Sequence, residues 1–219
     1  MNAKNKIEPL LKKYSDNTFL RATINGIPYI GGALDAIMTT GLQQKREERY
    51  QYFLDELKNQ IEKLSEDKLD YNYLNSEEFY DLFVMTSSYV VNTRIQDKVK
   101  AYTKILSSSL THGFINKTNP EDILNIIKDL TENDILMIKL ISNYLVSDSK
   151  RYSNEYIVFN AENLAELSEE FTHDFIFIGL LNLLKNSIII KNAVISAPLP
   201  KLSYQTTPLF DIVIEYLRE

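Results

Sequence analysis

The most informative absence in this sequence of 219 residues is cysteine, which does not occur at all. Disulfides, thiolate metal sites, iron–sulfur clusters and cysteine nucleophiles are therefore excluded together. Tryptophan is also absent, and glycine occurs only six times. With 44% hydrophobic and 25% charged residues, the composition is that of a globular protein. The lack of cysteine favours a cytoplasmic location.

Long apolar runs are missing as well. Residues 1–14 contain four lysines and too few apolar residues for the hydrophobic region of a signal peptide. The longest weakly polar stretch, residues 24–42, has about the length of a membrane span, but it contains Pro28, Asp35 and two threonines. We therefore expect neither an export signal nor a transmembrane helix.

Basic residues are fewer than acidic ones. The chain has 24 Lys and Arg against 30 Asp and Glu, a net charge of −6, and its pI is about 5.1. The excess is uneven, because residues 131–219 have seven basic and twelve acidic residues, whereas residues 1–130 have 17 and 18. This charge has the wrong sign for a protein whose main task is to bind nucleic-acid phosphates.

Helical periodicity dominates residues 1–130. The apolar spacing and the capping residues predict four helices: one over about 32–64, one over 76–92 capped by Ser76, one from Ile95 to Gly113, and one that begins at Pro120. The second helix is expected to bury Phe79, Leu82, Phe83, Thr86 and Val90. We expect these helices to form an antiparallel bundle, which makes 1–130 one domain of a mainly α protein.

Residues 131–219 predict a different order of elements. Thr131 with Asp134 indicates a capping arrangement at a first helix, and Asn160, Thr172 and Pro208 are expected to begin three more. Short β-branched or alternating segments predict strands at 156–159, 187–191 and 202–206. The predicted order is helix, strand, helix, helix, two strands, helix.

This order and three local segments resemble a winged helix. The segments are a Leu-rich helix followed by a strand at Ile188, the paired strands of a wing, and the closing sequence YQTTPLFDIVIEYL. The glycine that is usual before the last helix is replaced by Pro208 or Leu209. The resemblance implies a winged-helix-like domain with a small β-wing over 131–219, and such domains bind DNA or other proteins.

The chain also resembles a loose group of uncharacterised bacterial proteins that combine a helical N-terminal region with a winged-helix-like end. The similar segments are IPYIGGALDAIMTTGL, REERYQYFLDEL, NSEEFYDLF and RIQDKVKAYTKIL. Some members of the group occur in phage-defence (abortive-infection) contexts, so the resemblance implies such a setting. The group has no established catalytic residues to transfer to this chain.

An apolar stripe in the long helix is the first candidate interaction surface. Tyr50, Phe53, Leu57 and Ile61 recur at helical spacing. This stripe has two interpretations, since it could pair two chains as a coiled coil or be buried inside its own bundle. It spans about two heptads, fewer than the three or four that indicate a coiled coil.

The predicted helix over 172–186 is the candidate DNA reader. Its contacts would be Asn182, Lys185 and Asn186, with Lys191 in the following strand. The net charge of −5 over 131–219 opposes phosphate binding, so the sequence favours a protein-interaction fold over a DNA-binding one.

Catalytic signals are weak. His112 and His173 are the only histidines, and the carboxylates beside His173 are too few and too close in sequence to form a metal site. The serines at 107–109 lack the Gly-x-Ser-x-Gly pattern of a nucleophile elbow. We expect no enzyme, no catalytic or metal-binding residue and no cofactor, and the sequence identifies no small-molecule ligand.

The glycine-rich part of residues 24–42 is the most unusual segment, since it holds four of the six glycines. It could be a membrane-seeking segment, or a tight turn into the long helix, and Asp35 with the threonines favours the turn. The predicted function is therefore non-enzymatic protein–protein interaction or self-association, in bacterial defence or stress response. A DNA-binding regulator and a membrane-acting effector are the alternatives.

Overall fold

A computed structural model describes residues 43–114, 119–148, 158–168, 170–192 and 202–218. Of these residues, 74% are helical, in nine α-helices, and one small antiparallel sheet has two strands. The prediction of a mainly α protein with a small β element is therefore confirmed. The chain divides into two compact units between Lys128 and Asp129, and each is described by itself.

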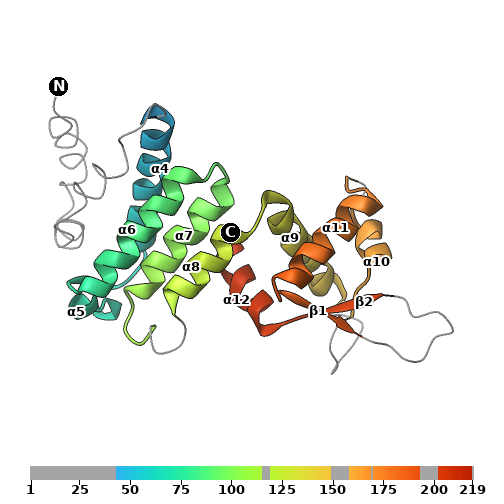
Figure 1. Cartoon of the computed structure of the whole chain (residues 1–219). Coiled ribbons are helices and arrows are strands. Elements are labelled where there is room, and N and C mark those ends of the chain that lie inside the picture. Colours follow the sequence, from blue (N-terminus) through green and yellow to red (C-terminus); the bar gives the residue numbers. More distant parts are fainter. Residues whose placement is uncertain (1–42, 115–118, 149–157, 169, 193–201, 219) are drawn as a thin grey trace. The chain divides into compact units, whose positions relative to one another are not determined.

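The first unit consists of helices. They are α4 (Gln43–Glu62), a 3-10 turn (Glu66–Lys68), α5 (Tyr71–Leu74), α6 (Glu77–Asn92), α7 (Gln96–Ser109) and α8 (Pro120–Asp129). Helix α4 packs against both α6 and α7, as Figure 1 shows. The predicted long helix is seen from Gln43 onward, and its expected first part lies outside the described residues.

The predicted apolar face of α6 is confirmed. All five expected residues are buried, together with Ser87 and Val91. The predicted cap is also present, since the Ser76 Oγ accepts a hydrogen bond from the backbone N–H of Phe79 at 3.2 Å. Burial of large side chains fixes the position of α6 in the unit, and the cap fixes where the helix begins.

The end of α7 differs from its prediction. The helix ends at Ser109, with Leu110 as its C-cap, rather than continuing to Gly113. Gly113 does adopt a left-handed conformation, with φ of 76°, in the turn that follows. The polar end of α7 explains the difference, because the Thr111 Oγ1 donates to the carbonyl oxygen of Ser108 at 2.7 Å and helps to close the last turn.

The second unit contains four helices and the sheet. The elements are α9 (Glu132–Asp148), α10 (Ala161–Leu167), α11 (His173–Lys185), β1 (Ile189–Asn192), β2 (Ser203–Thr206) and α12 (Pro208–Leu217). Helix α9 packs against α10, α11 and α12, so it forms the centre of this unit. Its buried side chains include Ile138 and Ile141.

The sheet is short and antiparallel. Ile189 lies opposite Thr206, and Asn192 lies opposite Ser203. Phe159 adds an isolated bridge to Tyr204, with reciprocal backbone hydrogen bonds of 2.9 and 2.7 Å. Of the strand predicted at 156–159, Val158 and Phe159 lie within the described residues.

Local capping chemistry sets the helix starts of the second unit. Thr131 and Asp134 form a reciprocal capping box, in which each backbone N–H donates to the other side chain, at 2.8 and 3.1 Å. The Asn160 Oδ1 accepts from the backbone N–H of Asn163 at 2.8 Å. Pro208 is the first residue of α12. These predicted helix starts are confirmed.

Candidate functional site

Helix α11 of the second unit has one buried face and also carries exposed large apolar residues. It begins at Thr172, whose Oγ1 accepts a hydrogen bond from the backbone N–H of Phe175 at 3.2 Å. One face of the helix packs against α9 and α10, as Figure 1 shows. The buried residues of this face are Ile176, Gly179, Leu180 and Leu183.

Gly179 allows the backbone of α11 to approach α9 closely. A Cβ atom added at this position would overlap the Met137 side chain, which lies fully buried on α9. A close approach of this kind requires a residue without a side chain. The inner face of α11 is therefore fixed against α9.

The C-terminal end of α11 is closed by a Schellman motif. The backbone N–H of Ile188 donates to the carbonyl oxygen of Leu183 at 3.0 Å, and that of Ser187 donates to Leu184 at 3.1 Å. Ser187 supplies the left-handed conformation that the motif requires, with φ of 58°. Both ends of α11 are thus held by defined hydrogen bonds, and the chain turns directly into β1.

The opposite face of α11 is exposed and partly apolar. Ile178 and Leu181 have 57% and 42% of their surface exposed, and the charged Asp174 and Lys185 stand at the two ends. The spacings of four, three and four residues place all four side chains on one line along the helix. We name these four residues the α11 stripe.

Phe177 enlarges the apolar part of this surface. It lies beside the α11 stripe and is 44% exposed, whereas Asn182, on the other side of the stripe, is half-buried. Single exposed apolar residues are ordinary, but three large ones within five positions form a contiguous patch. A patch of this kind on a fixed helix is suited to contact with another protein.

The residues predicted to contact nucleic acid lie near the end of α11 and in β1. Lys185 and Lys191 are exposed, and Asn182 and Asn186 are half-buried. Asn186 is the C-cap of the helix. The centre of the exposed face, where a DNA reader needs hydrogen-bonding side chains, is instead occupied by Ile178 and Leu181.

The predicted interaction stripe of the first unit is buried within its own unit. Tyr50, Phe53, Leu57 and Ile61 are exposed by only 4%, 0%, 3% and 1%. Helix α4 carries them and packs against α6 and α7. Of the two interpretations of this stripe, burial against neighbouring helices of its own unit therefore accounts for the helical periodicity.

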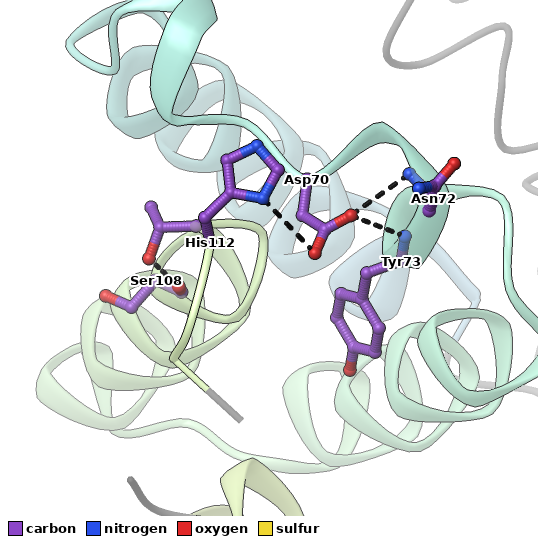
Figure 2. A network of polar contacts seen from close by, with 6 residues as sticks. Asp70, Asn72, Tyr73, Ser108 and His112 are labelled. Atoms are coloured by element: carbon purple, nitrogen blue, oxygen red, sulfur yellow. Dashed lines mark hydrogen bonds and ion pairs between the residues drawn. The ribbon is translucent and has the colours of Figure 1, made fainter. Parts of the chain in front are cut away.

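His112 belongs to a polar network that connects two parts of the first unit. Its Nδ1 lies 3.4 Å from Oδ2 of Asp70, and the other carboxylate oxygen accepts from the backbone N–H groups of Asn72 and Tyr73 at 3.1 and 3.0 Å (Figure 2). The pKa of Asp70 is lowered, mainly by the hydrogen bond from the backbone N–H of Tyr73. The nearby His112 and the N–H of Asn72 lower it further. The main effect of the carboxylate is to cap α5.

Ser107 and Ser109, two of the three serines considered as nucleophiles, form hydrogen bonds within α7. The hydroxyl groups of Ser107 and Ser109 donate to the carbonyl oxygens of Lys104 and Leu106, which explains their burial. His173 is the exposed first residue of α11. Across the described ranges there is no group of three or more His, Cys, Asp or Glu side chains that could hold a metal ion.

Two tyrosines of the apolar core have pKa values that burial raises well above the ordinary value. Burial raises the pKa of Tyr50, and it raises that of Tyr216 to about 12 with a smaller contribution from Glu215. Both side chains are part of the apolar core. Their shifts follow from packing and do not by themselves indicate a reaction.

The glycine-rich segment 24–42 lies outside the described residues. Among the helices that the structure does describe, none has the length and apolarity needed to cross a membrane. A comparison with models of known protein families gave no match, and searches of curated proteins and of solved structures also gave none.

The exposed patch on α11 is the feature that sequence reasoning did not identify. The sequence did contain a signal, because residues 175–184 are apolar almost all around the helix. A helix that packs on one side needs an apolar stripe on that side alone. The surplus of apolar residues could therefore have indicated a second covered face.

Proposed function

We propose that this chain is a non-enzymatic protein-interaction protein, and that it contacts its partner through the exposed face of α11. The observation that carries the proposal is the α11 stripe together with Phe177. Water contact with large apolar side chains is unfavourable, by about 25 cal/mol per Å² of apolar surface. A partner that covers these side chains would recover that free energy.

The proposal includes a winged-helix-like second unit. Its support is the order α9, Phe159 bridge, α10, α11, β1, β2, α12, together with the antiparallel pairing of β1 and β2. In this proposal α11 occupies the position of the helix that reads DNA in many winged helices, and here it meets a protein surface instead.

Charge and side-chain chemistry favour a protein partner over DNA. The basic Lys185 is balanced on the same stripe by Asp174, and residues 131–219 have a net charge of −5. A protein reads the sequence in the major groove mainly through side chains that hydrogen-bond to the base edges. Isoleucine and leucine cannot form such hydrogen bonds. A protein surface has the apolar side chains that complement such a patch.

The cellular setting is a second part of the proposal. The resemblance to bacterial proteins found in phage-defence contexts supports a role in defence or stress response. In that setting, α11 would join this chain to its protein partner, either a second copy of the chain or another component of the response.

Site-specific photo-cross-linking in the cells that naturally make the protein tests the proposed surface. A photoreactive phenylalanine analogue replaces Phe177, and in a control chain it replaces the exposed Leu136 on α9. We expect a discrete protein adduct from position 177 that disappears when Ile178→Glu is added. Adducts that form equally from both positions, or that persist with Ile178→Glu, would contradict the proposal.

A further inference from the structure

We propose that the partner of α11 is the same helix in a second copy of this chain, paired antiparallel about a two-fold axis. The inference rests on the proposed interaction function and specifies its partner. It depends on the arrangement of charged and apolar residues along the α11 stripe.

The α11 stripe is symmetric about its own centre. The midpoint between Gly179 and Leu180 lies equally far from Ile178 and Leu181, and equally far from Asp174 and Lys185. In a two-fold antiparallel pair centred there, Ile178 meets the partner's Leu181, and Asp174 meets the partner's Lys185. The same operation repeats both contacts, as an isologous interface requires.

The charges favour this orientation over the parallel one. A parallel pair would place Asp174 against the partner's Asp174 and Lys185 against the partner's Lys185, which is unfavourable in both places. The antiparallel pair forms two ion pairs instead. Asp174 and Lys185 are both exposed, and neither has an ion-pair partner within the part of the chain that the structure describes.

The apolar contacts complete the pairing. The stripe lies directly opposite the buried face of α11, so a second helix can approach it without disturbing Gly179 and its neighbours. Helix axes pack 8–10 Å apart, a separation at which side chains of the size of Ile178 and Leu181 interdigitate. Phe177 would lie across from the partner's Asn182 at the edge of the contact.

The size of this contact predicts a weak dimer. A single helix pair buries less than the roughly 800 Å² per partner of a standard stable interface. We therefore expect reversible association in the micromolar to millimolar range, with a dissociation constant that rises with salt because two surface ion pairs contribute.

Reversal of the two charges provides the decisive test. Asp174→Lys and Lys185→Asp are prepared separately in the full chain and studied by sedimentation equilibrium, alone and as an equimolar mixture. Each variant alone would place like charges together in both ion pairs, so we expect self-association about tenfold weaker than that of the wild type. The mixture restores opposite charges at both positions, and we expect heterodimers about as tight as the wild-type dimer.

Two further variants control for the apolar contact. Ile178→Glu should abolish association of the full chain, whereas Leu202→Glu, at a residue that is 55% exposed and lies outside α11, should leave it unchanged. Circular dichroism of all variants checks that the fold is retained, as expected for exposed positions.

The possible results separate this inference from the proposed function. A wild type that stays monomeric at millimolar concentration overturns the inference, and the proposed function still stands if position 177 cross-links to a different protein. Association that Ile178→Glu abolishes, but that the charge-reversed mixture does not restore, overturns the antiparallel arrangement. Association that Ile178→Glu leaves intact overturns the inference, and the cross-linking at position 177 then decides the proposed function separately.

Discussion

Two residues determine how α11 is held, and each does so through its backbone. Gly179 permits the close approach to Met137, and Ser187 provides the left-handed turn into β1. A glycine buried in a helix and a non-glycine residue with positive φ both run against ordinary residue preferences. The two positions therefore give predictions whose direction follows from local geometry.

Gly179→Ala should destabilise the fold, although alanine is the better helix former. The added methyl group overlaps the Met137 side chain, and such overpacking costs about 1–3 kcal/mol, against about 1 kcal/mol gained in helix propensity. In a Met137→Ala background, the same change should become stabilising. Urea unfolding of the single and double variants measures this, and an equal effect of Gly179→Ala in both backgrounds would contradict the packing argument.

Ser187→Gly should stabilise the second unit by about 0.5–1 kcal/mol, because glycine adopts the left-handed conformation without steric cost. The Ser187 side chain is exposed, so little packing is lost. Ser187→Ala, which keeps the Cβ atom, is the matched control and should give no such gain. Thermal unfolding compares the two variants, and a larger gain from alanine would refute the explanation.

At the scale of elements, the connection between α5 and the end of α7 is made by polar groups. Asp70 caps α5 and lies beside His112, while the backbone N–H of Asp70 donates to the carbonyl oxygen of Leu110 at 2.8 Å. The backbone N–H of His112 donates to the carbonyl oxygen of Lys68 at 3.0 Å. The two segments are thus joined by two backbone hydrogen bonds and by the contact between the His112 ring and the Asp70 carboxylate.

This network predicts a pH-dependent contribution to stability. The pKa of Asp70 is lowered in the folded protein, so its stabilisation is present above the ordinary carboxyl pKa and is lost as the pH falls through the lowered value. Asp70→Asn should therefore reduce the free energy of unfolding at pH 7 and have a smaller effect at pH 3. Urea unfolding at both values measures the difference.

Asp81→Asn is the control, because Asp81 is exposed on α6 and caps no helix. It should change stability little at either pH. If the cost of Asp70→Asn were the same at pH 7 and pH 3, the carboxylate would not be the source of the effect.

The elements also show which features a sequence can reveal. The caps at Ser76, Asn160 and Thr172 were predictable because an N-cap acts within three residues of the chain. The stripe from Tyr50 to Ile61 was predictable as a covered face, but periodicity does not identify the covering element. That information depends on α6 and α7, which are distant in sequence.

The surface of α11 is a second example of a feature that periodicity in the sequence does not identify. The apolar residues of this helix suggest burial, and the structure shows that Ile178 and Leu181 lie outside the core. Which side of an apolar helix faces its neighbours follows from tertiary packing, here from Gly179 against Met137. A single sequence contains the residues of both faces without distinguishing them.

At the scale of the whole molecule, charge is the property with the clearest functional consequence. The net charge is −6, and residues 131–219 contribute −5 of it. Non-specific binding to DNA depends on cationic contacts with phosphates and strengthens as salt is lowered. We expect DNA to repel a chain with this charge distribution at long range.

We therefore expect no binding of duplex DNA by the full chain, even at low ionic strength. Fluorescence anisotropy with a labelled mixed-sequence duplex at about 20 mM salt is the measurement, chosen because electrostatic binding is strongest there. Binding that appears at low salt and is removed by Lys185→Ala with Lys191→Ala would show that α11 and β1 contact DNA after all.

The fixing of α11 at both ends and along its inner face has a kinetic consequence. Thr172, Gly179 and Ser187 hold the helix in place, so binding of the proposed partner would require little ordering of the backbone. Association should then proceed at the ordinary rate for preformed surfaces, about 10⁵–10⁶ M⁻¹s⁻¹. Conservative truncations such as Leu181→Ala would mainly shorten the lifetime of the complex, so that encounters stay as frequent while each one ends sooner.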